Sequence, residues 1–179
     1  DFKMIIKPDQ VESSIKSKSN PNFVLIYGPN EGLIREVINK FIKSYKLDSQ
    51  VDEITIYGKD LDSENHFLIN EVKTFSMFSS KKIIQIEKIK ESQIEILIEV
   101  EKYLDQNIMI LVKSDNLNKN SKIRSFFEKS KSALSIACYE DDMRSMMNLI
   151  QEFQMRYSIK FSKECKEFLL QHLSTDRFI

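Results

Sequence analysis

Short runs of apolar residues alternate along the chain with longer segments in which apolar positions recur every three or four residues. Residues 23–27 are apolar throughout and are bounded by turn-forming residues, which is typical of a buried strand. In the segment that follows, Ile34, Val37, Ile38 and Phe41 fall on one face of a helix. The pattern therefore begins with a strand, a tight loop and a long helix.

The same alternation continues as far as residue 140. Further strands are predicted at residues 53–57, 82–87, 108–112 and 133–138, and helices at residues 9–18, 64–75, 94–104 and 121–129. Residues 94–100 also alternate as a strand would, but Leu97 breaks that period and we favour a helix. Strands that alternate with helices imply a mostly parallel sheet with helices on both faces, which is an α/β fold.

After residue 140 the pattern becomes helical. One helix is expected to carry Met143, Met146 and Ile150, and a second to begin at a Ser162 cap. We therefore expect an α/β domain over residues 1–140 and a small all-helical domain over residues 141–179. Because the chain begins at Asp1 and ends in Asp176-Arg177-Phe178-Ile179, we also expect it to be a fragment of a longer protein.

Composition narrows the class of protein. The chain has 179 residues, is 41% hydrophobic, and balances 27 Lys+Arg against 27 Asp+Glu, so its formal net charge is zero. A chain of this kind can bury a core and is not a disordered segment. Zero net charge also argues against a protein that holds nucleic acid by bulk electrostatics alone. Neither a membrane span nor a secretory leader is evident, and a cytoplasmic location is expected.

The loop after the first strong strand is placed like a phosphate-binding loop. It reads Gly28-Pro29-Asn30-Glu31-Gly32 and opens the long helix, where backbone N–H groups can hold phosphate. The signature G-x-x-x-x-G-K-[ST], counted from Gly28, puts Leu33, Ile34 and Arg35 at its three functional positions. None of these can do the required chemistry, so the loop is interpreted as a structural connection without a nucleotide cofactor.

Other chemistry-bearing residues are scattered. His66 and His172 are isolated, and Cys138 and Cys165 lie outside metal-ligand spacing, so no catalytic set and no metal site is predicted. The acidic residues between positions 91 and 105 follow one predicted helix and are interpreted as its solvated face.

The predicted helix at residues 64–75 continues into an unusually apolar end. Leu68, Val72 and Phe75 set its core face, whereas the adjacent Met77 falls on the polar stripe. Met77 and Phe78 could form an exposed apolar pair that fills a pocket on a partner, or they could fold onto the core at the helix end. The residues alone leave both interpretations open.

Several blocks in order resemble the DNA polymerase III delta subunit of the bacterial clamp loader. They are residues 23–36, 75–84, 117–128 and 136–139, together with Asp176-Arg177, so the resemblance extends over essentially the whole chain. It implies an AAA+/RecA-like first domain with a degenerate P-loop, a lid-like helical second domain, and a third, collar domain that this chain lacks. It also implies no ATPase activity and no cofactor in this subunit.

The resemblance further implies a partner and a binding site. Members of this family open the ring-shaped sliding clamp with two apolar residues, whose positions match Met77 and Phe78, with Thr74 and Phe75 as flanking contacts. Met77 departs from the leucine that is more usual there. The other implied partners are the delta prime and gamma/tau subunits, and weak DNA contact through lysines such as Lys119, Lys122 and Lys129 is a further hypothesis. The alternatives are a divergent P-loop NTPase and an α/β interaction module with another partner.

Overall fold

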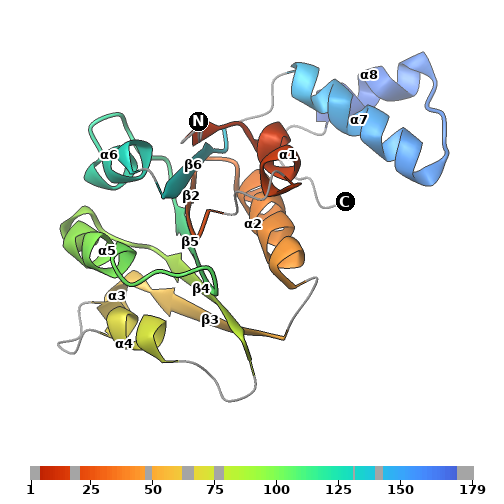
Figure 1. Cartoon of the computed structure of the whole chain (residues 1–179). Coiled ribbons are helices and arrows are strands. Elements are labelled where there is room, and N and C mark those ends of the chain that lie inside the picture. The colour runs from red at the N-terminus through yellow and green to blue at the C-terminus, as the bar shows by residue number, and fades with distance from the viewer. Residues whose placement is uncertain are drawn as a thin grey trace. The chain divides into compact units, whose positions relative to one another are not determined.

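The computed structural model describes residues 5–16, 21–46, 50–61, 67–74, 79–130, 132–139 and 143–172. The chain divides into two compact units, Asp1–Cys138 and Tyr139–Ile179. The first unit carries the sheet and the second is a pair of helices (Figure 1).

The first unit alternates strands and helices from its first described residues. Its strands are β1 (Ile5–Ile6), β2 (Phe23–Tyr27), β3 (Val51–Tyr57), β4 (Lys81–Glu87), β5 (Ile108–Ser114) and β6 (Ala133–Ala137). Its α-helices are α1 (Val11–Lys16), α2 (Glu31–Lys46), α3 (Gly58–Leu61), α4 (Phe67–Lys73), α5 (Ile94–Glu101) and α6 (Lys122–Lys129). Two 3-10 helices, η1 (Pro8–Gln10) and η2 (Glu91–Gln93), precede α1 and α5.

The strands form one parallel sheet in the order β1-β6-β2-β5-β4-β3. The chain therefore runs outward from β2 to the β3 edge and returns through β4 and β5 before it crosses to β6. This arrangement places β2, the strand before the predicted loop, between β5 and β6. All five residues of β2 are buried, as its unbroken apolar run predicted.

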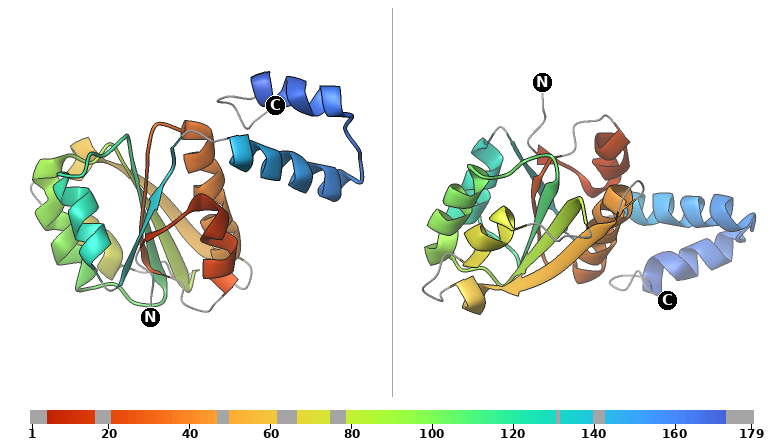
Figure 2. Two further views of the ribbon diagram at one scale, coloured as in Figure 1. Left: turned by 90° about the horizontal axis from the view of Figure 1, so that it is seen from above. Right: turned by 60° about the horizontal axis from the view of Figure 1, so that its bottom comes forward.

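Helices cover both faces of the sheet (Figure 2). On one face, Leu68 of α4, Leu97 of α5 and Phe127 of α6 pack in a single cluster with side chains of the strands. On the other face, α1 and α2 pack through residues such as Val11 and Phe41. The parallel sheet flanked by helices confirms the predicted fold class.

Most predicted elements of this unit are found with shifted ends. Two helices end earlier than predicted: α4 ends at Lys73, with Thr74 already outside it, and α5 ends at Glu101, where the prediction ran to residue 104. At the end of α4, the ammonium group of Lys82 donates to the Glu71 and Thr74 carbonyl oxygens. Helix ends leave such carbonyls without intrahelical partners, and a cation is favoured there.

The second unit consists of α7 (Met143–Tyr157) and α8 (Lys163–His172). Ser162 caps α8 as predicted, since its hydroxyl accepts a hydrogen bond from the Cys165 backbone N–H at 3.2 Å. Hydrogen bonds from the backbone N–H of Glu164 and from Ser162 lower the pKa of the Glu164 carboxyl. Several large apolar side chains of this unit are exposed, among them Met155 and Phe168.

Candidate functional site: the degenerate loop and the α4–β4 connection

The loop between β2 and α2 is shaped by close contact with the end of β6. Gly28 has a φ of 142°, and a Cβ atom built on it would lie 2.0 Å from the carbonyl oxygen of Cys138. A side chain therefore has no room there, and the φ value itself favours glycine. The glycine that begins the motif is required by the packing of two strand ends, whether or not a phosphate ever binds.

Two backbone N–H groups around the start of α2, those of Asn30 and Leu33, are bonded within the protein. The Asn30 N–H donates to the Cys138 carbonyl oxygen at 3.1 Å, and the Leu33 N–H donates to Asn30 Oδ1 at 3.0 Å. A phosphate cradle uses N–H groups that point at the ligand. Asn30 is 8% exposed, so this cap is a buried part of the fold.

The side chains of the loop also differ from those of a nucleotide site. Ile34, which stands where the signature requires lysine, is fully buried in the core against the sheet. Arg35 is exposed, and Glu31 forms an ion pair with Lys113 of β5 at 3.0 Å. The carboxylate of Glu31 brings negative charge to the helix N-terminus, where a phosphate would otherwise be favoured.

The predicted clamp-binding residues belong to the connection between α4 and β4. Phe75, Met77 and Phe78 lie outside the described residues. Thr74, their predicted flanking partner, is exposed, and its hydroxyl donates to the Asn70 carbonyl oxygen at 2.7 Å. The structure therefore describes the two ends of this connection, at Thr74 and at Ser79-Ser80.

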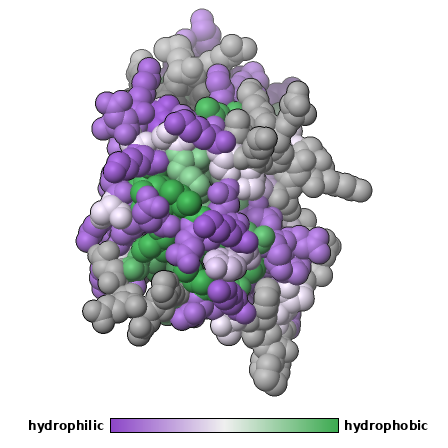
Figure 3. Space-filling view, turned by 60° about the vertical axis from the view of Figure 1, so that its left-hand side comes forward, coloured by the Kyte–Doolittle hydropathy of each residue, from purple (hydrophilic) through white to green (hydrophobic). Residues whose placement is uncertain are grey.

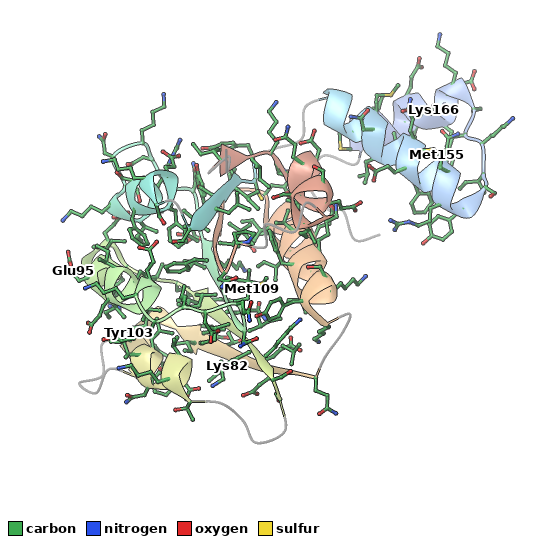
Figure 4. All side chains as sticks on the ribbon, in the orientation of Figure 1. Lys82, Glu95, Tyr103, Met109, Met155 and Lys166 are labelled. Carbon is green, nitrogen blue, oxygen red and sulfur yellow. The ribbon has the colours of Figure 1, made fainter. Side chains whose placement is uncertain are left out.

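Three residues, Glu71, Thr74 and Lys82, hold the two ends together, and we call them the neck. Lys82 is only 3% exposed and points from β4 toward α4 (Figure 4). Its Nζ atom lies 2.9 Å from the Glu71 carbonyl oxygen, 2.6 Å from the Thr74 carbonyl oxygen and 3.2 Å from Glu71 Oε2. A carboxylate oxygen of Asp52, on the neighbouring strand β3, lies 4.0 Å away.

An open groove of about 820 Å³ lies between α5 and α6, on the face of the sheet that α4 also covers. Ile94, Ile98 and Phe126 line it, with charged residues including Glu95 and Lys122 alongside, and Figure 3 shows apolar residues between hydrophilic ones on this side of the molecule. Among the described residues that line the groove, no set of groups resembles a catalytic site.

The acidic residues near this groove do more than face solvent. Glu91 of η2 caps α6, since its carboxylate accepts hydrogen bonds from Ser121 Oγ at 2.5 Å and from the Lys122 N–H at 2.8 Å. Glu101 likewise accepts hydrogen bonds from Ser130 and Ser132. Glu91 is exposed and Glu101 half-buried, and both also bond to residues at the two ends of α6, which lies next to α5 only in the folded chain.

Across the described ranges, no three His, Cys, Asp or Glu residues are grouped so that they could hold a metal ion. Nor is any described helix long and apolar enough to cross a membrane. Cys138 is buried and Cys165 is half-buried, and both are free thiols.

Comparison with known proteins decides the family. The family model described as "DNA polymerase III, delta subunit" matches residues 24–138, which is more than half of the chain. The chain belongs to the DNA polymerase III delta-subunit family. The match includes the degenerate loop, the neck and the whole α4–β4 connection. No curated protein matches the chain.

Solved structures show how widely the fold of this delta-family chain is shared. The Bacillus subtilis DNA clamp loader delta protein matches with a TM-score of 0.62 at 12% identity, covering 91% of this chain and 51% of that one. AMPPCP-bound DnaA from Aquifex aeolicus matches with a TM-score of 0.58 at 14% identity, covering 93% of this chain and 56% of that one. This delta-family chain therefore spans about half the length of these two structures and shares their AAA+ fold.

Sequence reasoning missed Lys82, the buried lysine of this delta-family chain that bonds to the end of α4. Lys82 stands in an apolar strand at a position that shares one face with Ile84 and Ile86, both of which are fully buried. A lysine at an inward-facing strand position is uncommon unless it is paired. The alternation of Lys82 with Ile84 and Ile86 was therefore a signal in the sequence that this lysine is buried. It could not indicate which groups the ammonium would contact.

Proposed function

We propose that this chain is a non-hydrolysing clamp-loader subunit that binds the sliding clamp and helps to open the ring for loading onto primed DNA. The single observation that carries the proposal is membership of the delta-subunit family over residues 24–138. The fold is consistent with it, since a solved clamp loader delta protein has the same arrangement over most of this chain.

The clamp-binding site in this proposal is Met77 and Phe78, with Thr74 and Phe75 as flanking contacts. Support comes from the residues at the two ends of the connection: Lys73, Thr74 and Ser80 are all exposed. A partner can therefore reach the surface on which the connection begins and ends. An apolar pair presented at such a place suits a small pocket on a partner protein, because burying each side chain contributes about 1.5–3 kcal/mol.

The clamp-opening step follows from differential binding. A subunit that binds the open ring more tightly than the closed ring shifts the ring toward the open state by that difference in binding free energy. The subunit needs no nucleotide of its own for this step. In the proposal, ATP is used by the gamma/tau subunits of the DNA polymerase III holoenzyme, which act with delta prime and with the full-length form of this chain in the cytoplasm.

Contact with DNA is a lesser part of the proposal. Lys119, Lys122 and Lys129 are exposed around the start and end of α6, so their ammonium groups are free to reach phosphates. Lysines give weak, salt-dependent contact of this kind without sequence recognition.

A nucleotide titration tests the non-hydrolysing part of the proposal. We expect no saturable heat and no phosphate release when Mg²⁺-ATP is added to the protein up to millimolar concentration. The reasons are the buried Ile34 at the lysine position and the N–H groups of Asn30 and Leu33, which are bonded within the fold. Micromolar binding with turnover would contradict this and favour a divergent P-loop NTPase.

A binding measurement with the sliding clamp of the same organism tests the proposal as a whole. We expect saturable binding of this chain to the clamp ring by surface plasmon resonance, with no binding to a carrier protein of similar charge. A chain that folds but does not bind the clamp would overturn the proposal. It would leave an α/β interaction module with a different partner.

A further inference from the structure

Lys82 is a buried charge that is fully engaged with the end of a helix. Placing an ammonium group away from water is costly unless it is paired and hydrogen-bonded. Here one ammonium group, with three protons to donate, has two backbone carbonyls and the Glu71 carboxylate within 3.2 Å. The number of acceptors matches the number of protons, so the pairing is complete without water.

The strand register explains why the ammonium group reaches these acceptors. Lys82 is the register partner of Asp52 on the edge strand β3, and it shares its face of the sheet with Ile84 and Ile86, toward α4. Lys81 lies on the opposite face, where its ammonium group sits 4.9 Å from the centre of the Tyr45 ring in α2. Two adjacent lysines thus contact helices on opposite sides of the sheet.

The bonded residues stand on either side of the connection that carries the proposed clamp-binding pair. Lys82 is eight residues beyond Thr74, and the bond between them closes the chain into a small loop. A second contact supports the last residues of α4, since Lys73 Nζ lies 4.0 Å from the centre of the Tyr103 ring. Met77 and Phe78 fall within this closed loop.

We infer that Lys82 is a positioning residue for clamp binding, which it serves by holding both ends of the α4–β4 connection in one place. This rests on the proposed function and adds to it the residue that presents the binding pair. Without the ammonium group of Lys82, the bond between β4 and the Thr74 carbonyl is lost, and with it one constraint on the two ends of the connection. Binding would then have to remove more conformational freedom, which weakens affinity without removing any contact to the clamp.

Three variants of the full chain test this inference. We expect Lys82→Met, which keeps the stem of the side chain and removes its three donors, to weaken binding to the clamp about tenfold. Lys82→Arg, which keeps the charge and the donors, should recover most of that loss. Lys81→Met is the matched control, because it removes the same charge one residue away on the other face, and its affinity should stay within about twofold of the wild type.

A double-mutant cycle separates positioning from general destabilisation. Circular dichroism and urea unfolding first establish that each variant is folded at the temperature of the binding experiment. In the Met77→Ala background, Lys82→Met should then cost much less affinity than in the wild type, because there is less of the apolar pair left to position. If Lys82→Met does not fold, Lys82→Gln, a smaller change that can still bond one carbonyl, takes its place in the cycle.

The experiment distinguishes failure of this inference from failure of the proposed function. If the wild-type chain does not bind the clamp, the proposed function itself is wrong. If the wild type binds, the inference is overturned when Lys82→Met binds as tightly as Lys81→Met, or when its loss is the same with and without Met77.

Discussion

Replacing Met77 and Phe78 together with alanine is expected to weaken binding to the sliding clamp by more than about a hundredfold. Each of these side chains, when buried in a partner, contributes about 1.5–3 kcal/mol, and about 1.4 kcal/mol corresponds to a tenfold change in affinity. Two such residues therefore account for at least a hundredfold if both are buried in the complex. Surface plasmon resonance with the clamp immobilised measures the change directly.

The matched control removes a methionine and a phenylalanine from elsewhere on the same chain. Met155 and Phe168 of the helical unit are 74% and 60% exposed, so their replacement by alanine deletes similar side chains with little effect on the core. We expect this control to bind the clamp within about twofold of the wild type. If the Met77→Ala/Phe78→Ala variant binds the clamp as tightly as the wild type, the chain still binds the clamp but its binding site lies at other residues.

Gly28→Ala is expected to destabilise the first unit by about 3 kcal/mol or more, which is among the largest effects of single substitutions. The new Cβ atom would lie 2.0 Å from the Cys138 carbonyl oxygen, and the backbone φ of 142° is unfavourable for alanine. Relief requires moving the backbone of Cys138, whose N–H donates to the Tyr27 carbonyl oxygen at 2.7 Å. Urea unfolding followed by circular dichroism gives the change in the free energy of unfolding.

The second glycine of the same motif provides the control for that experiment. Gly32 lies in α2, where alanine is favoured over glycine by about 1 kcal/mol on helix propensity. We expect Gly32→Ala to change the free energy of unfolding by no more than about that amount. Equal stability of Gly28→Ala and the wild type would mean that β6 does not meet the loop as closely as described.

The structural surroundings of Gly28 and Asn30 explain the loop of this family member without a bound phosphate. Gly28 has the position of a phosphate-loop glycine, yet its surroundings explain it completely through the contact with Cys138. Asn30 similarly caps α2 and bonds to β6 with its own N–H. A glycine at the position of a phosphate-loop glycine can therefore be required by packing alone, and its presence is a poor guide to ATP use.

The sequence by itself determined the parts of this protein that depend on near neighbours along the chain. The unbroken apolar run of β2 and the 3.6-residue spacing in α2 were sufficient for both elements, because burial of one face or of a whole strand leaves a local pattern. The alternation of such elements predicted the α/β class, and the failure of the phosphate-loop signature at Ile34 was visible from residue types alone. The assignment of clamp binding to Met77 and Phe78 also came from the sequence, and it stays a prediction.

Only the tertiary structure decided what happens between residues that are far apart in the chain. It placed the Cys138 carbonyl against Gly28, 110 positions earlier in the printed numbering, because β6 pairs with β2. It showed that α4 ends at Lys73, where the sequence pattern ran on to Phe75, and that an ammonium group from β4 bonds the carbonyls at that end. No local pattern records which backbone carbonyl a buried lysine will meet, since that depends on strand order and register, which are fixed only when the whole sheet assembles.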